Sequence, residues 1–341
     1  MYLDVPGGFS TQVAILEKPL AEYLPTSNWL LLGDMSVRLI WRSHNMPEPE
    51  VSNWVETSEA AKRMETLLPW LEHWAERNVH RNHTLVVVGG GVLSDMGGLA
   101  ASLYMRGIAW HVWPTSLLAQ IDAGIGGKTA VNLDSGKNLA GAFYHPQRMV
   151  VANSFLDSLS ARHLKSGKWE LIKMALIEGD IAWAESLLDC KIPSSSDMKH
   201  AIGLKIGIVN RDFKEHGERR LLNLGHTLGH AIESASNFDI LHGEAVGLGI
   251  LAACLLSKSC GVTAFPSGLI EKTAKQLAPL SSRIPVWEKC LPFLLRDKKN
   301  EAENNLHFII PIPASRPIQQ KISPEVLESA FAKLFFMVNS H

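Results

Sequence analysis

The chain has 341 residues, 46% of them hydrophobic and 20% charged, and its formal net charge is −1. This length and composition are typical of a globular protein with a sizeable core, and they leave room for two domains. The near-neutral charge gives no reason to expect nucleic acid or a membrane surface as a partner, and no stretch approaches the ~20 apolar residues that span a bilayer.

The N-terminus and the cysteines bear on the compartment. Met1 is followed by Tyr-Leu-Asp-Val-Pro-Gly-Gly, which lacks the basic and apolar regions of a signal peptide. The cysteines show no CxxC spacing, which favours buried thiols over a disulfide framework or a zinc knuckle. They are Cys190, Cys254, Cys260 and Cys290. We therefore expect a cytoplasmic protein.

Strand-like and helix-like patterns alternate in the first part of the chain. Apolar and β-branched runs predict buried strands, and apolar spacing over three and four residues predicts helices. Strands are expected at 29–33, 84–88 and 110–113, and helices at 58–76 and 95–106. This alternation predicts an α/β domain with a parallel sheet, which we place at residues 1–160.

Strand signals nearly vanish in the remainder of the chain. Helices are expected at 164–178, 198–209, 224–235, 243–257 and 324–336, and one late strand at 307–310. The sequence therefore predicts a mainly helical second domain over residues 161–341.

A glycine-rich turn follows the second expected strand. Gly89-Gly90-Gly91-Val92-Leu-Ser94-Asp95 stands between a strand and a helix. That context suits a phosphate cradle, because backbone N–H groups and the helix dipole favour an anion. The turn is neither a GxGxxG fingerprint nor a P-loop, so a plain tight turn is an equal alternative. Asp95 could equally be a helix cap.

Several cations stand on or near glycine loops. Lys128 follows Gly126-Gly127, and Lys137 follows Gly136. Lysines held on glycine loops in apolar surroundings meet an anion more often than lysines on a solvated face do. Further cations are Arg106, Lys173, Lys205, Arg219 and the pair Lys298-Lys299, which alone would be read as a solvated charge run. Together they predict a multiply anionic substrate.

Three histidines lie within seventeen residues. His226 and His230 are four positions apart, so they share one helix face, and His242 can return toward that face after a short break. Neutral imidazole is the commonest zinc ligand, and catalytic zinc usually takes three protein ligands. The spacing alone predicts a metal site with all three as ligands, and ordinary packed or surface histidines are the alternative.

In this order the segments resemble the 3-dehydroquinate synthase family of sugar-phosphate cyclases, over a region that runs roughly from Asp34 to Lys299. The motifs that carry the resemblance include Gly89–Asp95, Pro114–Asp122 and Gly126–Thr129. It implies a Rossmann-like α/β N-terminal domain, an all-helical C-terminal domain, and usually a homodimer.

The resemblance also implies roles for single residues. Glu170, His226 and His242 would bind one divalent metal, zinc or cobalt, and His230 would instead transfer protons on the substrate side. The residues implied to contact NAD are Asp34, Glu59, Lys62, Gly90, Gly91, Val92, Ser94, Asp95, Thr115, Ser116, Lys128, Lys137, Phe155 and Ser158. Those implied at the substrate are Asp122, Lys128, Asn138, Lys173, Lys205, Arg219, Asn223, either Lys298 or Lys299, and Arg106 from across a dimer.

The implied activity is the conversion of a sugar phosphate, 3-deoxy-arabino-heptulosonate 7-phosphate, into 3-dehydroquinate and phosphate, a step of the shikimate pathway. Transient oxidation by NAD, phosphate elimination, re-reduction and aldol closure would follow in turn. Another NAD- and zinc-dependent cyclase, a metal-dependent polyol dehydrogenase and a non-catalytic scaffold are the alternatives. Arg219 with Lys205 favours a carboxylate-bearing substrate.

Several positions depart from the family pattern, and three of them stand beside residues with implied roles. Ser94 stands where the turn usually has glycine, and it would be strained by about 1 kcal/mol or more if the backbone there required a glycine-only angle. Ser36 replaces an asparagine after Asp34, and Trp169 replaces a small residue beside Glu170. We expect these changes to affect cofactor affinity and the shape of the site more than the class of reaction.

Overall fold

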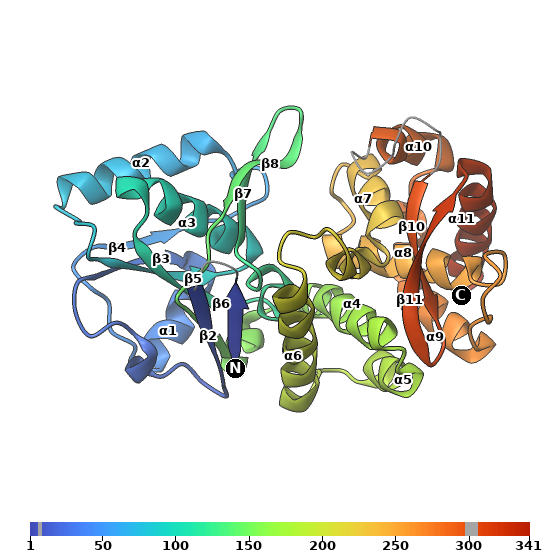
Figure 1. Ribbon diagram of the computed structural model, residues 1–341, viewed down its shortest axis with the longest axis horizontal. Helices are drawn as coiled ribbons and strands as arrows, with labels where there is room; N and C mark the ends of the chain where they lie inside the picture. Colours follow the sequence, from blue (N-terminus) through green and yellow to red (C-terminus); the bar gives the residue numbers. More distant parts are fainter. Residues whose placement is uncertain (6–8, 297–305) are drawn as a thin grey trace. The chain divides into compact units, whose positions relative to one another are not determined.

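The computed structural model describes residues 1–5, 9–296 and 306–341 (Figure 1). The chain forms two compact units, Met1–Leu164 with Met198–Phe213, and Lys165–Asp197 with Lys214–His341. Sequence analysis placed one boundary after residue 160, whereas the segment Met198–Phe213 packs with the first unit. Its Lys205 binds Asp122, and its Asn210 accepts a hydrogen bond from the Asp4 N–H. The functional division into residues 1–160 and 161–341 stays a prediction.

A seven-stranded sheet organises the first unit, with the strand order β1-β2-β9-β6-β5-β3-β4. Its strands are β1 (Tyr2–Val5), β2 (Phe9–Leu16), β3 (Trp29–Asp34), β4 (Ser52–Val55), β5 (Thr84–Gly89), β6 (Ala109–Pro114) and β9 (Arg148–Ala152). Only β1 and β2 pair antiparallel, and the other neighbours are parallel. Residues 30–32 and 85–88 are wholly buried, as expected for parallel strands that are covered on both faces.

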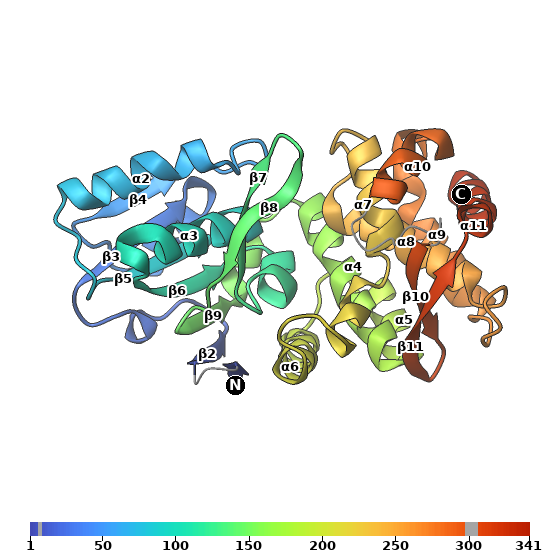
Figure 2. The ribbon, with the colours of Figure 1, turned by 45° about the horizontal axis from the view of Figure 1, so that its top comes forward.

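Helices and a hairpin complete this unit. They are α1 (Arg38–Ser43), α2 (Met64–Glu76), α3 (Gly91–Leu103), most of α6 (Ser195–Arg211), and the hairpin of β7 (Lys128–Leu133) and β8 (Gly136–Phe143). Helix α3 packs against both β5 and β7 (Figure 2). Two glycines allow this close approach, because a Cβ on Gly97 would strike Val87 of β5 and a Cβ on Gly98 would strike Thr129 of β7. The expected helix at 58–76 begins only at Met64, since residues 58–63 form a loop.

The second unit is built around α8. Its elements are α4 (Ala161–Glu178, from residue 165), α5 (Ile181–Asp189), α7 (His226–Ala235), α8 (His242–Leu256), α9 (Ser267–Leu277), α10 (Trp287–Arg296), α11 (Pro324–Asn339) and a hairpin of β10 (Leu306–Ile312) and β11 (Ser315–Ile322). Helix α8 is buried along nearly its whole length, and α7, α9, α11 and β10 pack on it. The hairpin makes this unit mainly helical rather than all-helical. Within the described ranges, no helix is long and apolar enough to cross a membrane.

Candidate functional site

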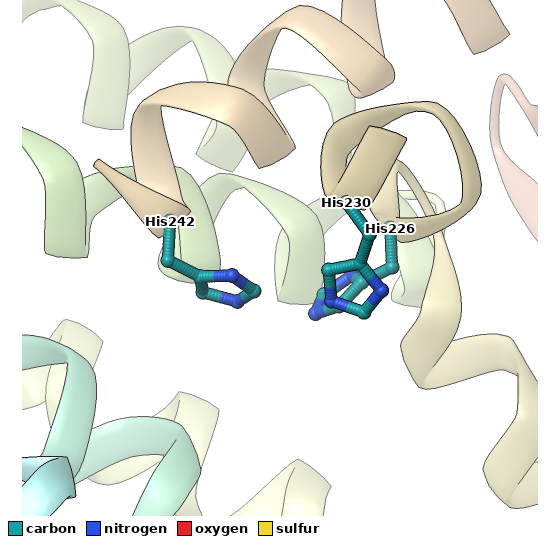
Figure 3. A group of neighbouring side chains, drawn as sticks. All are labelled: His226, His230 and His242. Carbon is teal, nitrogen blue, oxygen red and sulfur yellow. The ribbon is translucent and has the colours of Figure 1, made fainter. Parts of the chain in front are cut away.

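Three imidazoles converge where α7 and α8 begin (Figure 3). His226 and His230 come from successive turns of α7, and His242 is the first residue of α8. One ring nitrogen from each lies within 4.8 Å of the others. The structure thus confirms that the i,i+4 pair and the more distant histidine meet on one side, and among the described residues this is the group with the geometry to hold a metal ion.

Glu170 on α4 completes the cluster. Its side chain is 1% exposed, and its Oε1 lies 3.6 Å from Nε2 of His226 and 3.7 Å from Nε2 of His242. These separations are too long for hydrogen bonds. They are close to the separation of about 3.4 Å expected between two ligand atoms that share a tetrahedral zinc. Oε1 has no hydrogen-bond partner in the described part of the chain, an unusual state for a buried carboxylate oxygen. The donor set and its spacing fit a divalent metal.

Lys173 stands one helical turn after Glu170 and forms a buried ion pair with its Oε2. Both side chains are 1% exposed, so the ammonium is almost completely removed from water. Each charge offsets the cost of burying the other. The pair leaves Oε1 as the carboxylate oxygen that faces the histidines.

The rear nitrogens of two imidazoles also have acceptors. Nδ1 of His226 lies 3.1 Å from the Leu224 carbonyl oxygen, and Nδ1 of His242 lies 3.2 Å from Glu233 Oε2. A proton on each Nδ1 would leave the Nε2 lone pairs directed at the side of the cluster where Glu170 lies. Sequence reasoning missed Glu233, although a carboxylate three positions after His230 on one helix is a readable signal.

Glycines allow the three helices to approach closely. Gly225 precedes α7 with φ of +77°, in the left-handed region that favours glycine, and a Cβ there would lie 2.7 Å from the Val246 carbonyl oxygen. A Cβ on Gly243 would strike the backbone of Ser166 on α4. The glycines that flank the histidines in the sequence therefore set the distances between the metal-ligand candidates.

Two further predicted substrate residues lie near the start of α7. Arg219 is 3% exposed, and the Asn223 amide donates a 2.7 Å hydrogen bond to Glu215 Oε1. Glu215 has φ of +62°, an uncommon conformation for this residue, and sequence analysis did not single it out. Lys298 and Lys299 lie outside the described residues.

Lys205 on α6 belongs to the first unit, where it binds Asp122. Its Nζ donates to the Asp122 backbone oxygen at 2.6 Å and to Oδ1 at 2.5 Å. Asp122 stands in a π-helical turn, Ala119–Ala123, anchored by Gln120, whose amide donates to the carbonyl oxygens of Pro114 and Ala152. The predicted substrate cation and the predicted nicotinamide-side carboxylate are thus neighbours. Lys128 lies just beyond, as the exposed first residue of β7.

Most of the residues predicted to contact NAD lie at one edge of the sheet. Strands β9, β6, β5 and β3 are adjacent, and ten of the fourteen predicted residues follow their carboxyl ends. In sheet order these are Phe155 and Ser158, Thr115 and Ser116, the turn with Gly90, Gly91, Val92, Ser94 and Asp95, and Asp34. This edge is where open α/β sheets bind nucleotides.

Asp34 is held by two hydroxyl groups. Ser36 donates both its N–H (2.9 Å) and its hydroxyl (2.6 Å) to Oδ1, and Thr57 donates to Oδ2. Ser36 therefore orients Asp34 directly. The contacts fix the carboxylate at the end of β3, where acidic side chains meet a nucleotide ribose in sheets of this kind.

Lys62, Asp95 and Asn138 form a second polar group beside the glycine turn. The buried Lys62 Nζ contacts Asp95 Oδ2 at 2.5 Å and Asn138 Oδ1 at 2.6 Å. Burial raises the pKa of Asp95 to about 6, and the Lys62 ammonium opposes that rise. Glu59 lies next to this group, where it accepts from Asn132 at 2.8 Å and pairs with Lys137 at 3.7 Å. Asp95 therefore forms an ion pair with Lys62 and does not cap α3.

The expected strain at Ser94 is absent. Ser94 lies within α3 and its backbone does not adopt a positive φ. Its N–H and its hydroxyl both donate to the Gly90 carbonyl oxygen at 3.0 Å, the ordinary arrangement for a serine inside a helix. Positive φ values at non-glycine residues occur elsewhere in the described chain, among them two successive residues, Met105 at +49° and Arg106 at +65°.

Comparison with known proteins assigns residues 52–300 to one protein family. Residues 52–166 match the family model for the 3-dehydroquinate synthase N-terminal region, and residues 167–300 match the model for its C-terminal region. The 3-dehydroquinate synthase of Methylacidiphilum infernorum is 38% identical over 277 residues, which cover 78% of this chain and 74% of that protein.

Solved structures share the fold. A 2-deoxy-scyllo-inosose synthase complexed with carbaglucose-6-phosphate, NAD+ and Co2+ superposes with a TM-score of 0.82 at 23% identity, covering 98% of this chain and 99% of the other. The 2-epi-5-epi-valiolone synthase of Streptomyces hygroscopicus, with NAD+ and Zn2+ bound, gives a TM-score of 0.78 at 25% identity, covering 97% and 98%.

Proposed function

This chain belongs to the 3-dehydroquinate synthase family, and we propose that it converts 3-deoxy-arabino-heptulosonate 7-phosphate into 3-dehydroquinate and phosphate, using NAD and one divalent metal. The observation that carries the proposal is the position of Glu170 Oε1, which faces Nε2 of both His226 and His242 at 3.6 and 3.7 Å. A carboxylate with two imidazoles holds zinc or cobalt and leaves positions open for substrate oxygens.

The two bound groups would supply the chemistry that side chains lack. When bound by Glu170, His226 and His242, the metal would polarise substrate hydroxyl and carbonyl oxygens. When bound along the carboxyl ends of β3, β5, β6 and β9, NAD would accept a hydride from a substrate carbinol carbon and later return it. The overall reaction is therefore redox-neutral, and NAD is needed only in catalytic amount.

His230 has the position for proton transfer. It lies one turn after His226 on α7, its ring centroid is 5.5 Å from that of His242, and its side chain is exposed. In our proposal the imidazole accepts a proton from the substrate on the side away from Glu170. Histidine suits this task because its unperturbed pKa lies near neutral pH.

The buried cations suit a substrate with separate carboxylate and phosphate groups. Lys173, Arg219 and Lys205 are 1%, 3% and 5% exposed, so protein groups rather than water surround each charge. In our proposal they bind and orient the anionic substrate, together with Asn138, Asn223, Asp122 and Lys128. Charge-assisted hydrogen bonds in a desolvated site are strong, so this set would favour a carboxylate-bearing sugar phosphate over one without a carboxylate.

We further propose that the protein is a homodimer in the cytoplasm. Arg106 would then reach the active site of the partner from its strained turn. Met105 and Arg106 cost of order 1–3 kcal/mol each in this conformation, a cost that proteins tolerate mainly where it serves function.

The test is phosphate release from 3-deoxy-arabino-heptulosonate 7-phosphate with catalytic NAD, before and after chelation. We expect release without net NADH, its loss after chelation and its recovery with zinc or cobalt. Turnover of a sugar phosphate that lacks the carboxylate would shift the assignment to another cyclase. Net NADH formation from a polyol would indicate a dehydrogenase.

A further inference from the structure

Glu233 contacts the rear nitrogen of His242, with 3.2 Å between Nδ1 and Oε2. Glu233 lies on α7, and its side chain is 10% exposed. His242 is the first residue of α8, after a bend that ends with Leu241. A buried carboxylate on one helix thus contacts a metal-ligand candidate on the next.

The two candidate imidazole ligands differ in how they are held. His226 is 12% exposed and places Nδ1 against a backbone carbonyl oxygen, that of Leu224. His242 is 32% exposed, so fewer neighbouring atoms restrict the rotation of its ring than restrict that of His226. Its Nδ1 faces a carboxylate instead of a carbonyl. A carboxylate makes the stronger hydrogen bond and increases the electron density at the opposite nitrogen.

We propose that Glu233 is a positioning residue for the metal centre: it fixes the ring orientation and the Nδ1–H tautomer of His242, so that Nε2 is directed at the metal. The proposal rests on the metal site proposed above but not on the identity of the substrate. Glu233 does not bind the metal or the substrate in this account, and it acts only through His242.

A second buried carboxylate provides a matched comparison. Glu244 is 7% exposed and stands two residues after His242, but its Oε2 accepts a 2.9 Å hydrogen bond from the Leu241 N–H at the start of α8. This contact caps the helix. Glu233 and Glu244 therefore have the same charge and similar burial close to His242, but Glu233 contacts the imidazole whereas Glu244 accepts from a backbone N–H.

The experiment measures metal affinity in the full-length protein. Apoprotein variants Glu233→Gln, Glu233→Ala and Glu244→Gln are titrated with zinc against a chromophoric chelator, and with cobalt to record its visible absorption. We expect zinc affinity to fall roughly 10-fold for Glu233→Gln and up to about 100-fold for Glu233→Ala, with a changed cobalt spectrum. Glu244→Gln should stay within about 2-fold of the wild type, because its amide oxygen can still accept from Leu241.

Zinc affinity and the cobalt spectrum test the role of Glu233 independently of the proposed reaction. Wild-type affinity and an unchanged cobalt spectrum in Glu233→Ala would overturn the role of Glu233, as would equal losses in Glu233→Gln and Glu244→Gln. A wild-type protein that binds no zinc would overturn it too. If affinity follows Glu233 while no phosphate is released, the inference stands and the proposed reaction fails. If Glu233→Ala does not fold, the zinc affinity of Glu233→Gln tests the role of Glu233, and its thermal melting curve shows that this variant is folded.

Discussion

The indole of Trp169 lies directly over Gly247, where a Cβ would approach the ring carbon Cδ2 to 2.5 Å. Trp169 precedes the ligand candidate Glu170 on α4, and Gly247 follows His242 on α8. Trp169 is larger than the residue expected beside Glu170 in this family. Its indole fits because Gly247 has no side chain. This contact joins the helix of the carboxylate to the helix of the third histidine.

Gly247→Ala should disturb both stability and the metal site. An added methyl group must push the indole away, and overpacking of this kind costs about 1–3 kcal/mol. Since the indole is attached next to Glu170, zinc affinity should fall as well. Gly268→Ala on α9 is the control, because a Cβ there meets nothing within 4 Å. In a double-mutant cycle, Trp169→Leu should recover part of the loss. Additive losses would refute the contact.

The division of roles among the histidines can be tested by metal content. His226→Ala and His242→Ala should lose metal and activity together, because each removes an imidazole whose Nε2 faces Glu170. His230→Ala should retain metal and lose about 10²–10⁴-fold in rate, the usual contribution of a general acid or base. Metal content by mass spectrometry and single-turnover kinetics measure these effects. The ring nitrogens of all three lie within 4.8 Å, so equal metal loss in each variant would favour three-histidine coordination.

Glu170→Gln should destabilise the metal-free protein as well as remove a ligand. It leaves the Lys173 ammonium buried without its carboxylate, and breaking a buried ion pair costs about 3–5 kcal/mol. Replacing both residues, as Glu170→Gln with Lys173→Met, should recover much of this stability. The exposed pair Lys272–Asp189 is the control, and Asp189→Asn should destabilise the protein much less, because water already solvates both charges. Urea denaturation with chelator present measures all four proteins.

The sequence predicts best where one physical signal dominates. Residues 84–88 read as a strand because parallel strands are apolar on both faces, and β5 is found there. The i,i+4 spacing of His226 and His230 places them on one face of any helix, as α7 confirms. The hairpin of β7 and β8 was not predicted, because its residues are largely half-buried or exposed and form no continuous apolar run.

Contacts between distant residues were beyond the reach of sequence pattern. The pair of Lys205 and Asp122 joins positions 83 residues apart, and only the packing of α6 on the first unit brings them together. Spacing suggested three histidine ligands, and the carboxylate of Glu170 entered only through the resemblance to a family. Residues 58–63 were expected to be helical, yet they form a loop, and in this loop Lys62 lies close enough to donate a hydrogen bond to Asp95.

His111 on β6 should make the protein less stable in acid. Its side chain is 7% exposed, and burial, aided by the nearby Arg148 cation, lowers the pKa of the imidazole from 6.5 to about 4. The fold therefore favours the neutral ring, whereas the unfolded chain takes up a proton below pH 6.5. The stability that His111 contributes is complete above pH 6.5 and is lost as the pH falls toward 4, by about 3 kcal/mol in all. His111→Gln cannot titrate, so its unfolding free energy should lack this decline, whereas exposed His80→Gln should follow the wild type. Parallel curves for His111→Gln and the wild type between pH 4 and 6.5 would show that the ring is not held neutral.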